Sequence, residues 1–148
     1  MRLPILIAAL SIALAGCGSR QPASAVTVER AYVRLSAVPG QPAAGYATIT
    51  ASPDRGALAG LSSSQAGRIE MHETMSAGSM TSMRPVERID IRAGEAVLFA
   101  PGGRHLMLFD VDRTLKPGDR ADLSLHFAHG PPVIVKARVI AAGDDAPY

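Results

Sequence analysis

Short apolar runs with alternating hydrophobic and polar positions recur along the chain from Val26 onward. A period of two residues places alternate side chains on opposite faces of a β-strand, and this region offers no sustained helical period with caps. The clearest run is 122–127, in which Leu123, Leu125 and Phe127 alternate with polar side chains. The pattern predicts strands at Val26–Leu35, Gly45–Ala51, Leu58–Ser63, Arg68–Thr74, Thr81–Val86, Ala96–Phe99, His105–Phe109, Ala121–Phe127 and Val133–Ile140.

Turn-forming sequences such as Pro39-Gly40 and Pro101-Gly102 separate these runs. Eight or nine short strands, spaced by about ten residues, are typical of a β-sandwich or a Greek-key β-barrel, so we expect an all-β fold. We find no internal repeat and no second domain. The predicted domain covers residues 26–141, and a short tail follows at 142–148.

The N-terminal region has a different composition. An apolar run of 13 residues, Leu3–Ala15, is shorter than the roughly 20 residues that span a bilayer as a helix. It is typical of an export signal, which we place at residues 1–16. The run ends in Leu14-Ala15-Gly16-Cys17, which resembles a bacterial lipobox. We therefore expect Cys17 to carry a lipid that anchors the mature protein to a membrane.

A polar stretch at 17–25 is suited to tether the domain to such an anchor. The sequence Ala23-Ser24-Ala25 offers a competing cleavage site, which would give a soluble secreted protein instead. In both cases we expect the mature chain outside the cytoplasm, in the periplasm.

Composition excludes several classes of site. The chain of 148 residues has 15 Lys and Arg against 13 Asp and Glu, a net charge of +2, and its basic residues are scattered. We therefore expect no nucleic-acid partner. A single Cys can form neither an internal disulfide nor, by itself, a cysteine-based zinc or iron–sulfur site.

Residues 71–83 contain four of the six methionines of the chain. Methionine usually fills gaps in an apolar core, and Met71 fits that role. Met75 and Met80 do not, because the segment offers them no Leu, Ile, Val or Phe to pack against. We consider two roles for this pair: secondary metal donors that assist the entry or transfer of an ion, or positions in a solvent-exposed loop.

A hairpin turn at Ala77-Gly78 would place His72 opposite Met83, so the two side chains could belong to one ligand-binding site. Met75 would then lie opposite Met80 on the other face of the hairpin. A slip of one residue would break this pairing.

A second pair of donors is His105 and Met107, which lie two residues apart and therefore share one face of a strand. Imidazole and thioether groups form a soft, neutral donor set that suits Cu(I) better than zinc, calcium or magnesium. A blue-copper electron-transfer site requires a Cys thiolate. The one Cys of this chain belongs to the signal region, so a site of this type is excluded.

The spacing of these residues resembles that of the periplasmic copper chaperones called PCu(A)C. Their signature is a His, ten residues, a Met, twenty-one residues and then His-x-Met, which His72, Met83, His105 and Met107 satisfy. The similarity covers roughly residues 26–140. It includes Ala43-Ala44-Gly45-Tyr46-Ala47-Thr48-Ile49-Thr50, Arg84-Pro85-Val86, Ile91-Arg92-Ala93-Gly94, Pro101-Gly102-Gly103-Arg104-His105-Leu106-Met107-Leu108 and Leu115-Lys116-Pro117-Gly118-Asp119.

The resemblance implies a cupredoxin-like β-barrel that binds one Cu(I) ion through those four side chains. It also implies delivery of the ion to the CuA centre of cytochrome c oxidase subunit II, directly or with Sco-type thiol proteins. The chain departs from the family at Glu73, where a Met is often found, and at Tyr32, where many members have Trp. Residues 141–148 lack His and Met, so we expect no second copper site in the tail.

Other functions remain open. A copper-resistance or storage lipoprotein would bind the same metal without passing it to the oxidase, and a structural β-sandwich lipoprotein would not bind metal at all. We expect a monomer. We also expect no enzymatic activity, because no nucleophile–base pair, carboxylate dyad or phosphate loop has a recognisable spacing. His126 and His129 are expected to be solvated.

Overall fold

The computed structural model describes residues 25–148, and within them the prediction of an all-β fold is confirmed. The predicted signal peptide at 1–16, the lipidated Cys17 and all but the last residue of the tether lie outside the described residues. Within 25–148, no helix is long and apolar enough to cross a membrane. The elements are β1 (Val26–Arg34), β2 (Ala43–Ala51), η1 (Pro53–Arg55), β3 (Ala57–Ser62), β4 (Ala66–Ala77), β5 (Met80–Pro85), β6 (Ile89–Asp90), β7 (Ala96–Phe99), β8 (Arg104–Val111), β9 (Arg120–Phe127) and β10 (Val133–Ile140).

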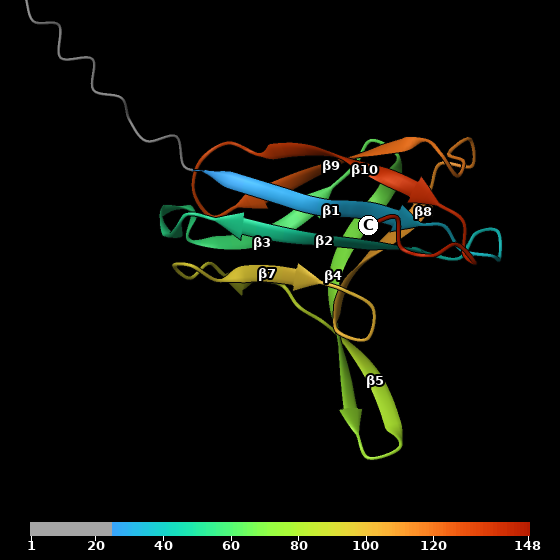
Figure 1. Ribbon diagram of the computed structural model, residues 1–148, viewed down its shortest axis with the longest axis horizontal. Coiled ribbons are helices and arrows are strands. Elements are labelled where there is room, and N and C mark those ends of the chain that lie inside the picture. Colours follow the sequence, from blue (N-terminus) through green and yellow to red (C-terminus); the bar gives the residue numbers. More distant parts are fainter. Residues whose placement is uncertain (1–24) are drawn as a thin grey trace, which may run out of the picture.

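The strands form one sheet in the order β5-β4-β8-β2-β1-β10-β9-β3-β6, and β7 pairs with β2. β1 and β10 run parallel, whereas β4 pairs antiparallel with both β5 and β8. The hydrogen-bonded ladder of the described residues ends at β5 and β6, so it is not closed into a barrel. Figure 1 shows the strands gathered into one body, from which the end of β4 and β5 project.

One cluster of buried apolar side chains forms the core of the domain. On β9 the predicted alternation is confirmed, because Leu123, Leu125 and Phe127 are buried while the residues between them are half-buried. Met71 of β4 is also buried in this cluster, which confirms its packing role. The same period of two turns the neighbouring side chains of each strand away from the core.

Residues 25–148 form ten strands where the sequence predicts eight or nine. The additional one is β6, which is only two residues long and pairs with β3. β7 and β10 have their predicted bounds, whereas β4 continues past Thr74 to Ala77. This longer strand changes the shape of the hairpin that follows.

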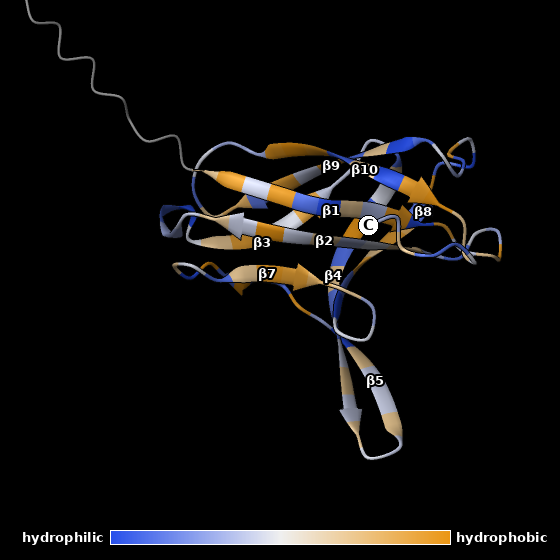
Figure 2. Cartoon of the chain, viewed as in Figure 1, coloured by the Kyte–Doolittle hydropathy of each residue, from blue (hydrophilic) through white to orange (hydrophobic). Residues whose placement is uncertain are grey.

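We define the arm as residues 74–83, the outer part of the β4–β5 hairpin that projects from the body (Figure 1). All six residues of β5 are exposed, and β5 forms one edge of the sheet. Figure 2 shows the arm mostly in pale colours with short hydrophobic segments, whereas strands of the body carry strongly orange segments beside white and blue ones. The arm therefore lies outside the core, and its base is where β4, β5 and β8 meet.

Candidate metal centre

His72 and His105 lie directly opposite each other in the β4–β8 ladder. Their ring centroids are 5.9 Å apart and the rings are inclined by 44°. Imidazole nitrogens lie about 2 Å from a bound metal ion, so two rings that share one ion have centroids about 5–6.5 Å apart. The observed separation of 5.9 Å lies within this range.

The turn at 101–103 sets the start of β8 and thereby the position of His105. Gly102 has a positive φ of 80°, and Ala100 pairs with Arg104 through a backbone hydrogen bond of 2.8 Å. Glycine adopts this left-handed conformation without the strain that a Cβ would cause. The chain therefore reverses sharply and begins the strand one residue before His105.

Met107 shares the face of His105, as predicted. The residue between them, Leu106, points to the other face and is fully buried in the core. Met107 lies opposite Glu70, so it is diagonal to His72 across the ladder. Diagonal neighbours are about 7–8 Å apart, within the reach of a long thioether side chain.

The predicted register of the β4–β5 hairpin is wrong by two residues. The turn consists of Gly78 and Ser79, so Met83 lies opposite Thr74 and His72 lies opposite Pro85. A positive φ of 62° at Gly78 fits a type II′ turn, which takes glycine at its first central position. Because the period of a strand is two residues, a slip of two leaves Met83 and His72 on the same face, as diagonal neighbours.

Met75 and Met80 lie on the other face of the arm from His72. Met75 is opposite Ser82 and not opposite Met80, which corrects the predicted pairing. The two thioethers are nevertheless diagonal neighbours, and their side chains are 46% and 75% exposed. They do not converge with the histidines.

In each of the two imidazole rings, one nitrogen forms a hydrogen bond with the protein and the other nitrogen does not. Nδ1 of His105 donates a hydrogen bond of 3.1 Å to the carbonyl oxygen of Gly103. Nε2 of His72 lies 2.9 Å from Oε2 of Glu70, to which it donates. Nδ1 of His72 is buried and has no hydrogen-bond partner. A neutral imidazole with one N–H donor retains a lone pair on its other nitrogen, so both rings can bind a metal ion.

Glu70 lies beside His72 on the same face of β4. The hydrogen bond that it accepts from His72 is the main cause that holds its pKa below the usual range, and the hydrogen bond from Arg68 is the next.

Glu73 lies on the other face of β4, opposite Arg84 of β5 and Arg104 of β8. Its carboxylate is 2.9 Å from Arg84 and 3.4 Å from Arg104, and the hydrogen bond from Arg84 is the main cause that lowers its pKa. Glu73 thus links the three strands at the base of the arm.

Hard-ligand metal sites find no support in residues 25–148, where no three His, Cys, Asp or Glu side chains could hold a metal ion together. The two remaining histidines have other contacts. His126 lies 2.7 Å from the hydroxyl of Ser62, and the ring of His129 packs against Gly56. The face that carries His72 and His105 also carries the thioethers of Met83 and Met107, and thioethers bind soft ions.

Glu70 and Arg68 are part of the site but were not among the residues predicted from the sequence. Both share the face of His72, at two and four residues before it. Their spacing on a predicted strand was a usable signal, because residues two apart lie on one face. The pairing with the imidazole, however, follows only from the side-chain geometry.

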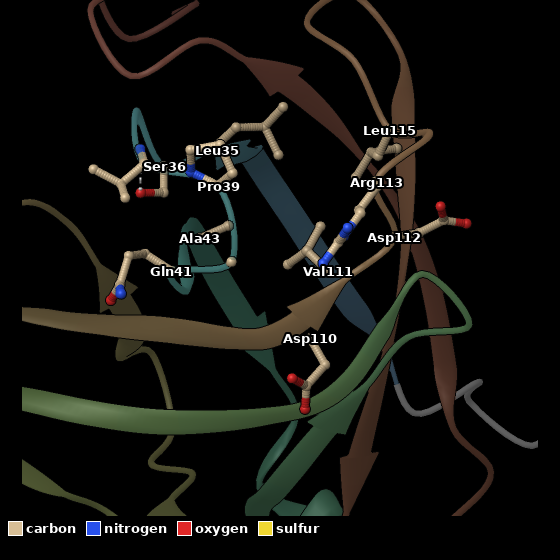
Figure 3. Close-up of a pocket in the computed structure, with 12 residues that line it drawn as sticks. Leu35, Ser36, Pro39, Gln41, Ala43, Asp110, Val111, Asp112, Arg113 and Leu115 are labelled. Carbon is tan, nitrogen blue, oxygen red and sulfur yellow. Dashed lines mark hydrogen bonds between the residues drawn. The ribbon is translucent and has the colours of Figure 1, made fainter.

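A hollow of about 690 Å³ lies between residues 35–43 and 110–115, beyond the far end of β8 from His105. Figure 3 shows Leu35, Ala43 and Val111 among the side chains around it. The residues that line it include no His and no Met. It is therefore separate from the candidate metal centre.

Comparison with known proteins gives a consistent set of relatives. The sequence family described as "Putative lipoprotein LpqE-like" matches residues 26–139. A protein of Leifsonia xyli subsp. xyli, described as a "Putative lipoprotein", is 30% identical over 134 residues, covering 84% of this chain and 80% of that protein.

Two solved structures share the fold. The copper-bound PCuAC domain from PmoF2 is 25% identical, with a TM-score of 0.65 over 80% of this chain and 96% of that domain. The Cu(I) form of DR1885 from Deinococcus radiodurans is 25% identical, with a TM-score of 0.60 over 84% of this chain and 83% of that protein. Both relatives were solved with copper.

Proposed function

Because the chain belongs to the LpqE-like lipoprotein family and shares the fold of PCuAC domains, we propose that it is an extracytoplasmic copper chaperone and not an enzyme. Its cargo is one Cu(I) ion, bound by His72, Met83, His105 and Met107. The observation that supports this most directly is that β4, β5 and β8 carry all four side chains on one face.

The chemistry of these donors favours Cu(I). Two imidazoles and two thioethers carry no charge, and thioethers bind soft ions while zinc, calcium and magnesium prefer thiolate, imidazole or oxygen. The distance of 5.9 Å between the ring centroids of His72 and His105 supports the proposal, because it is compatible with two imidazoles that bind one ion.

Exposure of one ligand suits transfer. Met83 is 60% exposed on the arm, whereas the side chain of His72 is only 14% exposed. A partner can therefore displace the thioether of Met83 first while the histidines still hold the ion. Copper moves as Cu(I) throughout, so the exchange needs no electron donor or acceptor.

We propose that the acceptor is the CuA site of cytochrome c oxidase subunit II, reached directly or through a Sco-type thiol protein. A lipid on Cys17, with 17–25 as the tether, would hold the chaperone at a membrane. The chain acts as a monomer in this scheme, because all four donors come from one copy.

Anaerobic titration of the purified protein with Cu(I), in competition with a chromophoric chelator, tests the metal site. We expect one Cu(I) per chain, and a large loss of affinity in His72→Ala and in Met107→Ala. His126→Ala is the matched control, because His126 lies on β9, where its ring contacts Ser62 of β3 outside the proposed site. Equal copper binding by wild type, His72→Ala and Met107→Ala would show that the metal site is wrong.

Delivery is tested separately. The Cu(I)-loaded protein is mixed with a copper-free CuA domain or a Sco-type protein, the two are separated, and the copper in each is measured. We expect most of the copper on the acceptor. If it stays on this chain, delivery to the oxidase is wrong, and a storage or resistance role explains the copper site better.

A further inference from the structure

We propose that Glu70 is a positioning residue that fixes the His72 imidazole so that its Nδ1, and not its Nε2, binds copper. His105 then binds through Nε2, so the two histidines present different ring nitrogens to the ion. This inference rests on the proposed function and specifies the geometry of its site.

Both oxygens of the Glu70 carboxylate are engaged. Oε2 accepts the hydrogen bond of 2.9 Å from Nε2 of His72, and Oε1 accepts one of 2.7 Å from Nε of Arg68. An ionised carboxylate only accepts hydrogen bonds, so the proton of His72 lies on Nε2. The lone pair of the ring is therefore on Nδ1.

Arg68 is itself held in place. Its guanidinium carbon lies 3.9 Å from the ring centroid of Phe109, which is the residue opposite it on β8. Stacking of this kind orients a guanidinium group. A chain of contacts thus runs along the outer face from Phe109 through Arg68 and Glu70 to His72.

A contribution to folding stability does not explain the contacts among Phe109, Arg68, Glu70 and His72 well. The side chains of Arg68 and Glu70 are 56% and 37% exposed, and ion pairs at such positions contribute little to folding. Orientation of a ligand is a better explanation, because histidines that bind metal ions commonly donate their other N–H to a carboxylate.

The unengaged nitrogen of His72 supports the same conclusion. Four buried side-chain nitrogens in residues 25–148 have no hydrogen-bond partner, and three of them are the Nε atoms of Arg34, Arg55 and Arg104. Nδ1 of His72 is the fourth and the one with a lone pair. Buried polar atoms are nearly always paired, so this nitrogen is suited to receive a ligand.

The most direct test observes the ring nitrogens by NMR. Protein labelled with ¹⁵N-histidine is recorded without metal and with one equivalent of Cu(I), using long-range ¹H–¹⁵N correlations that separate Nδ1 from Nε2. We expect the copper-induced shifts at Nδ1 of His72 and at Nε2 of His105. A copper-induced shift at Nε2 of His72 would overturn the inference, whereas failure of the wild type to bind Cu(I) would instead overturn the proposed function.

Variants of Glu70 give a second readout. Glu70→Leu removes both acceptors, so we expect mixed His72 tautomers and a Cu(I) affinity lower by about 10–100-fold. Glu70→Gln keeps one acceptor oxygen, so its Cu(I) affinity should fall less than that of Glu70→Leu. The Gln variant also supplies the comparison with wild type if the Leu variant does not fold. Glu95→Gln, an exposed carboxylate beside Arg92, is the charge control and should bind as wild type. Unchanged tautomer and affinity in the Glu70 variants would show that its role is only that of a surface ion pair.

Discussion

His72 stands directly opposite His105 across two antiparallel strands, and each ring uses one nitrogen for the protein and leaves the other without a protein partner. The carboxylate of Glu70 and the carbonyl of Gly103 thereby define which nitrogen of each ring is available. The thioethers of Met83 and Met107 flank this pair along the same face.

The two faces of the arm should contribute differently to copper binding. Met83→Ala should weaken Cu(I) binding by about tenfold or more, which corresponds to about 1.4 kcal/mol of binding free energy. The double variant Met75→Ala/Met80→Ala should keep the wild-type affinity, because both thioethers lie on the opposite face. Chelator competition measures both.

The same double variant also tests an assisting role for Met75 and Met80 in transfer. We expect slower delivery of Cu(I) to the acceptor at unchanged affinity, as measured by stopped-flow mixing. Unchanged transfer rates would leave the pair as exposed positions of the hairpin, with no part in copper exchange.

Glu73 should restrain the arm. Glu73→Gln removes the charge that links Arg84 and Arg104, so the amides of residues 74–83 should exchange with solvent roughly two- to tenfold faster, since exposed ion pairs stabilise only weakly. Hydrogen exchange followed by NMR measures this, with Glu95→Gln as the control. Protection that is unchanged in the arm would show that its hairpin hydrogen bonds suffice.

Leu106 should support the site from below. It is fully buried between the two ligands of β8, and Leu106→Ala should cost about 2–5 kcal/mol of unfolding free energy because it leaves a cavity. Urea unfolding measures the loss. Leu98→Ala, at an exposed position of β7, is the matched control and should change stability little.

Asp112 should make stability depend on pH in the acid range. Hydrogen bonds from the backbone N–H and the hydroxyl of Thr114 hold the pKa of its carboxyl below the ordinary value of 3.8. A group with a lowered folded pKa contributes stability above its unfolded pKa, and that contribution is lost as the pH falls from 3.8 through the folded pKa.

Side-chain carbonyl NMR gives the pKa of Asp112 directly, and Asp112→Asn should flatten the acid limb of the unfolding curve relative to Asp145→Asn. A pKa of Asp112 at or above 3.8 would contradict the hydrogen bonding to Thr114.

Much of the fold follows from local patterning. β7 and β10 start and end where alternation predicts, because buried and exposed positions there match a period of two. The bulge in β1, where the register shifts between Glu29 and Tyr32 and Arg30 has a φ of 52°, had no signal in the sequence, since arginine has no preference for this conformation. β6 is too short to give a period.

The candidate site was predictable in part. The shared face of His105 and Met107 follows from their spacing alone, and the structure confirms it. The register of the arm depended on which residues form the turn, and Gly78 at the first position shifts it by two. The choice of ring nitrogen at His72 depends on the contact with Glu70, which one-dimensional spacing does not specify.

X-ray absorption at the copper edge, recorded on protein loaded anaerobically with one equivalent of Cu(I), tests the central claim most directly. The account predicts one Cu(I) ion per chain with a mixed shell of imidazole nitrogens and thioether sulfurs, and loss of the sulfur contribution in the double variant Met83→Ala/Met107→Ala. A shell of nitrogen and oxygen alone in the wild type, or no bound Cu(I), would contradict it.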